Sequence, residues 1–181
     1  MMLRFLCIAI LVTAFMFSCS DNSYNKLPAK PVSIQEAKNF LRGKEFVTER
    51  TGFFSNITIN DKTEMEWIDV DKEKEKYAKE AAVEQKKFAL KFVSDSVVTL
   101  FKRDTSFAAT YNIDNEAGDR DEDDEGIKLK ISYTDPEFSF GGTDSPITFT
   151  YVILGTEGDK LLLQLPQTIN RRKLISLLKT E

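Results

Sequence analysis

The sequence predicts a mainly β domain, namely an antiparallel up-and-down barrel of about 8–10 strands with a short N-terminal helix and one inserted helix. The strongest indication is an alternation of apolar and polar residues that recurs over 107–113, 127–133 and 147–153. This period of two is that of a strand with one buried face. Turn sequences separate most of these stretches, so neighbouring strands are expected to be antiparallel. Closing the meander into a barrel removes its exposed edges.

The N-terminal helix is predicted over residues 34–42. Ser33 and Glu36 have the spacing of a capping box, in which the Ser33 hydroxyl accepts from the Glu36 amide and the Glu36 side chain reaches back. Gly43 is a natural stop for the helix. The residues that share one face of this helix are apolar: Ile34, Ala37, Phe40 and Leu41.

From Glu45 the pattern changes to a period of two, with Phe53, Ile57 and Ile59 at odd positions, and Asn60-Asp61 marks a turn before Met65 and Trp67. Residues 71–87 then interrupt the strand pattern with dense charge. We interpret them as a solvated helix inserted between strands, with a narrow apolar face that holds Tyr77, Ala81 and Phe88.

Strand patterns resume after this helix. Residues 88–92 and 97–101 flank a turn at Ser94-Asp95-Ser96, and residues 155–159 are expected to turn into a strand over 161–165. The tail over 173–180 fits either a helical face or a closing strand, and its position after a strand favours the strand.

Two connections, 115–126 and 135–146, are longer than ordinary hairpin loops and are candidates for functional rims. The first is strongly acidic, and Asp119, Asp121 and Asp123 have the 1-3-5 spacing of an EF-hand loop. The glycine required at position 6 is Asp124, and the glutamate required at position 12 is Lys130. The motif fails, so no metal site is predicted and a solvated loop is the expected structure.

Composition excludes several classes of chemistry. The chain has no histidine, and its two cysteines are Cys7 and Cys19. Zinc and copper sites built on His and Cys are therefore excluded. Catalytic Ser-His-Asp and Cys-His relays are excluded as well. The formal charge of −4 and the lack of a basic stripe argue against a nucleic-acid partner. Asp69, near Met65 and Trp67, is the carboxylate closest to an apolar strand face. We therefore predict no catalytic residue, no cofactor and no enzymatic activity.

The aromatic residues leave two alternatives open. Fourteen Phe, five Tyr and one Trp occur in the chain, many of them at inward-facing strand positions. They fit a packed core, which is the simpler interpretation, or an apolar cavity, since a small closed barrel can either fill its interior or hold one small ligand. The residues predicted to line such a cavity are Trp67, Phe107, Tyr111, Ile131, Tyr133, Phe149 and Tyr151.

The first residues have the layout of an export signal. Arg4 is followed by an apolar run from Phe5 to Phe17, then by Ser18 and Cys19. A charged start, a short apolar core and a small residue at the cut are typical of secretory signals. The run is shorter than the roughly 20 residues that a spanning helix needs. The expected organisation is a signal peptide (1–18), a polar tether (19–32) and one β-barrel domain (33–181).

These head residues resemble the signal of bacterial lipoproteins. That resemblance implies cleavage before Cys19 and acylation of its thiol with chains such as palmitate. Ser20, where retained lipoproteins carry Asp, implies the outer membrane, on its periplasmic or surface face. Because stable membrane attachment takes more than one acyl chain, the several chains of a lipoprotein cysteine are enough to hold the protein there.

The body resembles the bacterial lipocalin-like lipoproteins. The resemblance rests on the opening Leu41-Arg42-Gly43-Lys44-Glu45-Phe46 and on a late hairpin over Tyr151–Leu165. It implies a barrel that can hold a small apolar ligand in the cell envelope, and it carries no catalytic residue across. Two other functions stay open: an interaction or assembly accessory of the envelope that uses the acidic loop, and a carboxylate-dependent hydrolase.

Overall fold

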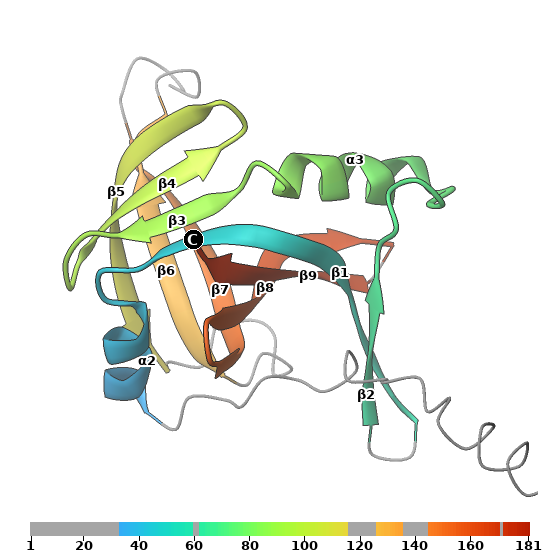
Figure 1. Ribbon diagram of the computed structural model, residues 1–181, viewed down its shortest axis with the longest axis horizontal. Helices are drawn as coiled ribbons and strands as arrows, with labels where there is room; N and C mark the ends of the chain where they lie inside the picture. The colour runs from blue at the N-terminus through green and yellow to red at the C-terminus, as the bar shows by residue number, and fades with distance from the viewer. Residues whose placement is uncertain (1–32, 60–61, 116–125, 136–144, 171) are drawn as a thin grey trace, which may run out of the picture.

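Eight antiparallel strands close into a barrel, as the sequence predicted (Figure 1). A ninth strand pairs with the part of one barrel strand that continues past the wall. The computed structural model describes residues 33–59, 62–115, 126–135, 145–170 and 172–181. The strands are β1 (Glu45–Ile59), β2 (Lys62–Trp67), β3 (Ala89–Phe92), β4 (Val97–Lys102), β5 (Thr105–Asp114), β6 (Ile127–Tyr133), β7 (Ile147–Glu157), β8 (Lys160–Ile169) and β9 (Arg172–Thr180).

The topology is an up-and-down meander. Each strand from β3 to β9 pairs with the next, and β1 closes the barrel by pairing with both β3 and β9. The tail is the closing strand β9, as favoured over a helix. The turn between β7 and β8 is tighter than predicted, because the two strands run to Glu157 and Lys160 and leave only Gly158-Asp159 between them. Gly158 has a positive φ of 59°, which suits such a turn.

The length of β1 explains the ninth strand. Phe46 to Phe54 pair with β9, whereas Gly52 to Ile59 pair with β2, so β1 continues past the barrel wall. Among the described residues β2 pairs with β1 alone. The two strands form a ribbon that projects from the barrel on the lower right of Figure 1.

Helix α2 (Ile34–Leu41) covers one end of the barrel. The Ser33 hydroxyl accepts from the Glu36 amide at 3.2 Å and donates to the Glu36 carboxylate at 3.1 Å, which confirms the predicted N-cap. Ala37 and Leu41 are fully buried in the barrel core. The helix ends before Gly43, whose φ of 67° is the left-handed conformation expected just after a helix.

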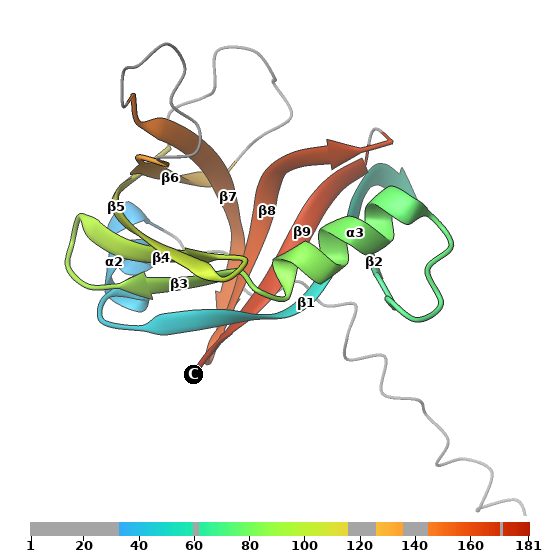
Figure 2. The same cartoon turned by 90° about the horizontal axis from the view of Figure 1, so that it is seen from above.

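Helix α3 (Lys76–Gln85) covers the opposite end (Figure 2). Its buried stripe is Ala78, Ala81, Ala82 and Gln85, the spacing of one helical face. The inserted helix was predicted correctly, but the prediction that Tyr77 belongs to its apolar face was wrong, because Tyr77 is 67% exposed. Three alanines face the barrel instead. Among the described residues neither helix is long and apolar enough to cross a membrane.

Two separate hydrophobic clusters hold the domain together. The larger one fills the barrel interior and includes Phe46, Leu90, Leu129 and Ile131, each fully buried. The second lies on the outward face of the wall and consists of Val152, Leu154, Leu162, Ile175 and Leu177, with Met65 and Trp67 of β2 packed against it. Alternate residues of β7, β8 and β9 therefore belong to two different hydrophobic clusters, one on each face of the wall. In a small barrel whose outer face meets water, only the inner face would be apolar.

Candidate functional site

Four of the seven predicted cavity residues gather at the α3 end of the barrel. Phe107, Tyr133 and Phe149 come from the neighbouring strands β5, β6 and β7, with ring centroids 4.9 Å apart for the first pair and 5.9 Å for the second. Tyr151 follows on β7 and lies 5.8 Å from Phe88, which enters just after α3. These are ordinary distances for aromatic rings packed against one another. We call the four residues Phe107, Tyr133, Phe149 and Tyr151 the mouth cluster.

The space left at the mouth cluster is small. A cavity of about 30 Å³ lies between α3 and the ends of β4, β6, β7 and β8. That is room for about one water molecule, whereas sites for small ligands usually enclose roughly 300–1,000 Å³. At this position the structure therefore agrees with the packed-core alternative. The lining residues are Glu84, Gln85, Phe88, Leu100, Lys102, Tyr133, Phe149, Tyr151, Leu165, Pro166 and Gln167.

Polar groups also reach this cavity. The Gln85 side chain is 9% exposed, and its Oε1 atom is buried without a hydrogen-bond partner among the described residues. Leaving a buried acceptor unpaired costs about 1–3 kcal/mol, so this atom is available to a donor. Lys102 Nζ lies 5.5 Å from the centroid of the Phe149 ring. The sequence interpretation missed Gln85, although it stands seven residues after Ala78 on the alanine stripe.

Burial also fixes the protonation state of Tyr151. Desolvation, and then the neighbouring Tyr133, raise the pKa of the Tyr151 phenol well above its usual value of 10.0. The phenol therefore keeps its proton, and can donate it, to a higher pH than an exposed tyrosine would. Desolvation likewise raises the pKa of Tyr133.

Helix α3 is held over the mouth cluster by light contacts. Its buried stripe offers alanine methyl groups, which bury little apolar area. Two ion pairs join its ends to the barrel: an exposed pair of Glu84 with Arg103 at 3.2 Å and a partly buried pair of Glu75 with Arg172 at 3.0 Å. The exposed pair contributes little to stability. The helix is therefore the part of this end that can be displaced at least cost.

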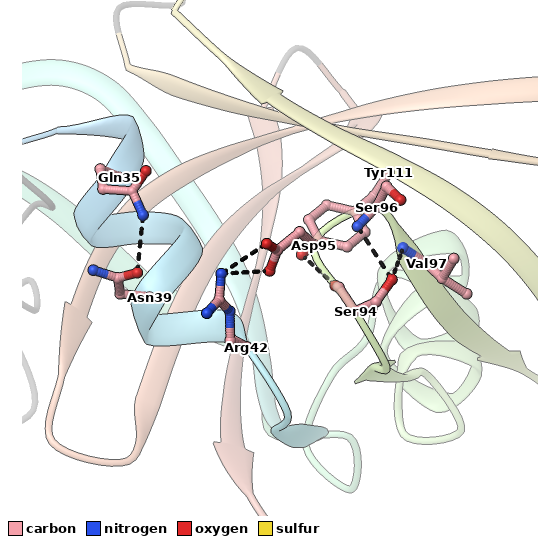
Figure 3. Close-up of polar contacts among 8 residues, drawn as sticks. All are labelled: Gln35, Asn39, Arg42, Ser94, Asp95, Ser96, Val97 and Tyr111. Atoms are coloured by element: carbon pink, nitrogen blue, oxygen red, sulfur yellow. Dashed lines mark hydrogen bonds and ion pairs between the residues drawn. The ribbon is translucent and has the colours of Figure 1, made fainter.

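Tyr111 and Ile131 lie deeper in the barrel and do not join the mouth cluster. Ile131 is fully buried in the interior. Tyr111 lies near the α2 end, where its ring centroid is 5.0 Å from that of Phe92 and its hydroxyl donates to the Ser94 carbonyl at 2.9 Å (Figure 3). Close by, Arg42 of the α2 C-cap forms an ion pair with Asp95 at 2.7 Å. Tyr111 therefore helps to close the α2 end rather than to line an open cavity.

The prediction that Trp67 lines the interior was wrong. Trp67 packs on the outward cluster, because β2 lies beyond the closed wall and belongs to the ribbon. Its ring passes over Gly52, where a β-carbon would come within 2.9 Å of the Trp67 ring. Apolar alternation is the same for a wall strand and for a ribbon strand, so the sequence pattern could not separate them.

Asp69 lacks the environment of a catalytic acid. It is exposed, and a hydrogen bond from the Lys72 side chain lowers its pKa, whereas an acid catalyst needs a raised pKa. No cluster of three or more His, Cys, Asp or Glu side chains suited to a metal occurs within the described ranges. Cys19, the acidic residues 116–125 and most of the second long connection lie outside the described residues.

Comparisons with known proteins found no matching family model, no matching curated protein and no matching solved structure. The site is therefore defined by the geometry of the mouth cluster and of α3 above it.

Proposed function

We propose that this chain is a lipocalin-like binding protein of the bacterial cell envelope, anchored to the outer membrane by acyl chains on Cys19, that takes up a small ligand at the α3 end. The closed barrel is the architecture that such a function requires. The mouth cluster supplies apolar ring surfaces for the body of the ligand. No catalytic role is proposed for any residue.

The observation that carries the proposal is the unpaired Oε1 atom of Gln85 beside these rings. An acceptor that is buried at an aromatic mouth fits a ligand with an apolar body and one O–H or N–H donor. Because the cavity holds only about 30 Å³, binding requires α3 to move away from the mouth. The alanine stripe and the exposed Glu84–Arg103 ion pair keep the free-energy cost of this displacement low.

Two measurements test the ligand. Organic extraction of the purified protein, followed by mass spectrometry, identifies any molecule that copurifies. For a defined probe, decanol is compared with its methyl ether, which has the same chain but no O–H. We expect decanol to bind about 2–10-fold more tightly, the effect of one hydrogen bond, and Gln85→Leu to remove the difference. Tyr111→Phe, at the other end of the barrel, is the matched control. No binding of either probe and no copurifying molecule would contradict the proposal.

The anchor is tested separately. Labelled palmitate should be incorporated into the parent chain, which should fractionate with outer membranes. Cys19→Ser should abolish both. A parent chain that carries no label would leave the binding domain without its proposed anchor, whatever the ligand experiment gives.

The packed interior favours a second candidate, an interaction or assembly accessory of the envelope. A filled barrel acts through its surface, and the strongly acidic residues 116–125 are a candidate contact for a basic partner. Replacing them with a Gly/Ser linker of the same length should then remove a crosslinked envelope partner. An unchanged set of partners would count against this candidate.

A further inference from the structure

An open groove runs along the outer side of α3, which lies beside one end of the barrel in Figure 2. Its volume is about 510 Å³, within the roughly 300–1,000 Å³ of binding sites. The groove shares only Glu84 with the cavity at the mouth cluster, so it is a second and separate hollow. Six residues of the helix and its C-terminal end and one residue of the turn between β4 and β5 line it: Lys76, Lys79, Glu80, Val83, Glu84, Lys87 and Arg103.

Cations outnumber carboxylates in this groove. Four of its seven lining residues are Lys or Arg and two are Glu, whereas the whole chain has a formal charge of −4. Glu80 is 3.9 Å from Lys76 Nζ, which makes it a loose pair. The turn adds one more acid, Asp104, 2.8 Å from Lys87 Nζ. Even with this third carboxylate, the four cations are in excess. The groove is therefore a basic surface on an acidic protein.

Two of these cations are available to an anionic partner. Lys79 is exposed and forms no ion pair within the described ranges. Lys87 pairs with Asp104, whose side chain is 84% exposed, and such a surface pair is weak enough to be exchanged. Glu84 is occupied by Arg103 at 3.2 Å, so its charge is already balanced.

Val83 gives the groove an apolar centre. Its side chain is 47% exposed, although it is apolar. It stands one helical turn after Lys79 and one turn before Lys87, and residues at this spacing share one face of a helix. The Lys87 amide donates to the Glu84 carbonyl at 3.1 Å, which continues the last turn of α3. The outer face therefore presents a stripe of cation, apolar residue and cation.

The backbone of Arg103 adopts a conformation that favours glycine. Its φ is 58°, in the two-residue turn that joins β4 to β5. The arginine supplies a guanidinium there, and its Nε donates to Glu84 Oε1 at 3.2 Å. This contact balances a carboxylate that would otherwise repel an anionic partner. An unfavourable backbone conformation that serves a surface in this way points to a binding role.

We propose that this groove binds an acidic segment of a partner polypeptide, which lies extended along α3 with an apolar side chain between two acids. At about 1.5 Å per helical residue, Lys79, Val83 and Lys87 follow one another at steps of about 6 Å. Alternate residues of an extended chain are about 6.7 Å apart and point to the same side. An acid, an apolar residue and a second acid at alternate positions therefore face the three residues of the stripe in turn.

The groove suits a polypeptide segment better than two other anionic partners. A small anion such as phosphate would meet the cations and leave Val83 in water. A flat bilayer surface would not follow the hollow between α3 and Arg103. Neither argument uses the ligand or the lipid anchor of the proposed function.

The test uses the purified protein, labelled with ¹⁵N, and three peptides with blocked ends: Asp-Ser-Leu-Ser-Asp, Asp-Ser-Ser-Ser-Asp and Asn-Ser-Leu-Ser-Asn. Backbone amide chemical shifts are followed as each peptide is added. Lys79→Glu reverses one charge of the stripe. The matched control is Lys86→Glu, because Lys86 is also exposed at α3 but does not line the groove. The dispersion of the amide signals reports whether each variant is folded.

We expect the first peptide to shift the amide signals of residues 79–87 and of Arg103, and to bind more tightly than the other two. Lys79→Glu should weaken its binding about 2–30-fold, because an attractive surface pair is replaced by a repulsive one. Lys86→Glu should bind as the parent does at about 0.15 M salt, where screening limits the effect of a charge to its close neighbours.

Three results would overturn the proposal. The first is the absence of shifts with the first peptide, or an equal loss of affinity in the two variants. The second is equal binding of the first two peptides, because Val83 would then have no part in recognition. The third is binding of phosphatidylglycerol vesicles that Lys79→Glu abolishes while no peptide shifts α3, which would assign the groove to a lipid surface. None of these readouts involves decanol or palmitate, so the groove and the proposed function can fail independently.

Discussion

The Tyr111 hydroxyl on β5 donates a hydrogen bond to the Ser94 carbonyl oxygen at 2.9 Å, which ties the barrel wall to the turn between β3 and β4 (Figure 3). Two more bonds order the same turn: the Tyr111 amide donates to the Ser96 carbonyl at 2.8 Å, and the Ser94 hydroxyl accepts from the Val97 amide at 3.2 Å. Within the same turn, Asp95 forms an ion pair with Arg42 of the α2 C-cap. Hydrogen bonds and one ion pair therefore connect Tyr111, through this turn, to α2, and together they close the α2 end of the barrel.

Tyr111→Phe should lower the free energy of unfolding by about 1 kcal/mol, because it removes one partly buried hydrogen bond and leaves the ring packed on Phe92. The effect is measured by urea unfolding at neutral pH. Tyr77→Phe, which removes an exposed phenol on α3, should leave the unfolding midpoint unchanged. Equal midpoints for the two variants would show that the Ser94 contact does not stabilise the turn.

Ser176→Ala should raise stability by about 1 kcal/mol or more. The Ser176 side chain is fully buried, and its Oγ atom has no hydrogen-bond partner among the described residues, so the substitution removes an unpaired polar group without changing the backbone. Ser132→Ala is the matched control: the Ser132 and Thr148 hydroxyls lie 2.7 Å apart, and that variant should lose rather than gain stability. Thermal unfolding of both variants decides the sign. A loss for Ser176→Ala would reveal a partner for Oγ.

Local patterns predicted the wall of this barrel well. The alternation at Tyr111, Ile131 and Ile153 gave strands and inward faces, and the Ser33 cap gave the start of α2, because each signal depends on a few neighbouring residues. The sequence predicted a closed barrel but not the position of β2 outside its wall. That β1 would overshoot and carry Trp67 to the outward face depends on pairing between β1 and β9, far apart in the chain. The alanine stripe of α3 was missed because Tyr77 dominated a narrow apolar face.

Gly52→Ala should lower stability by about 1–3 kcal/mol, the usual cost of an extra group in a packed site. A β-carbon at Gly52 would come within 2.5 Å of the Glu66 carbonyl oxygen and 2.9 Å of the Trp67 ring, so β2 must shift. We expect the emission of Trp67 to change along with the unfolding midpoint. At Gly43, where no atom lies within 4 Å but φ is positive, Gly43→Ala should lower stability through backbone strain and leave Trp67 emission as in the parent. An unshifted Trp67 spectrum in Gly52→Ala would contradict the packing of the ribbon on the wall.

The Tyr151 phenol should make the barrel sensitive to alkali. Its pKa is raised in the folded state by burial, whereas in the unfolded chain it returns to about its usual value of 10.0. Above that pH the unfolded state releases a proton that the folded state retains, so the free energy of unfolding falls as pH rises. Below about pH 9 both states keep the proton and Tyr151 contributes no pH dependence.

Urea unfolding of the parent and of Tyr151→Phe between pH 8 and pH 11 measures the difference. The parent should lose stability more steeply than the variant above pH 10, because its Tyr151 phenol ionises only in the unfolded chain, whereas Tyr133 is present in both proteins and contributes equally to both. Parallel curves across that range would mean that Tyr151 meets water in the folded protein, and that α3 does not seal the mouth of the barrel.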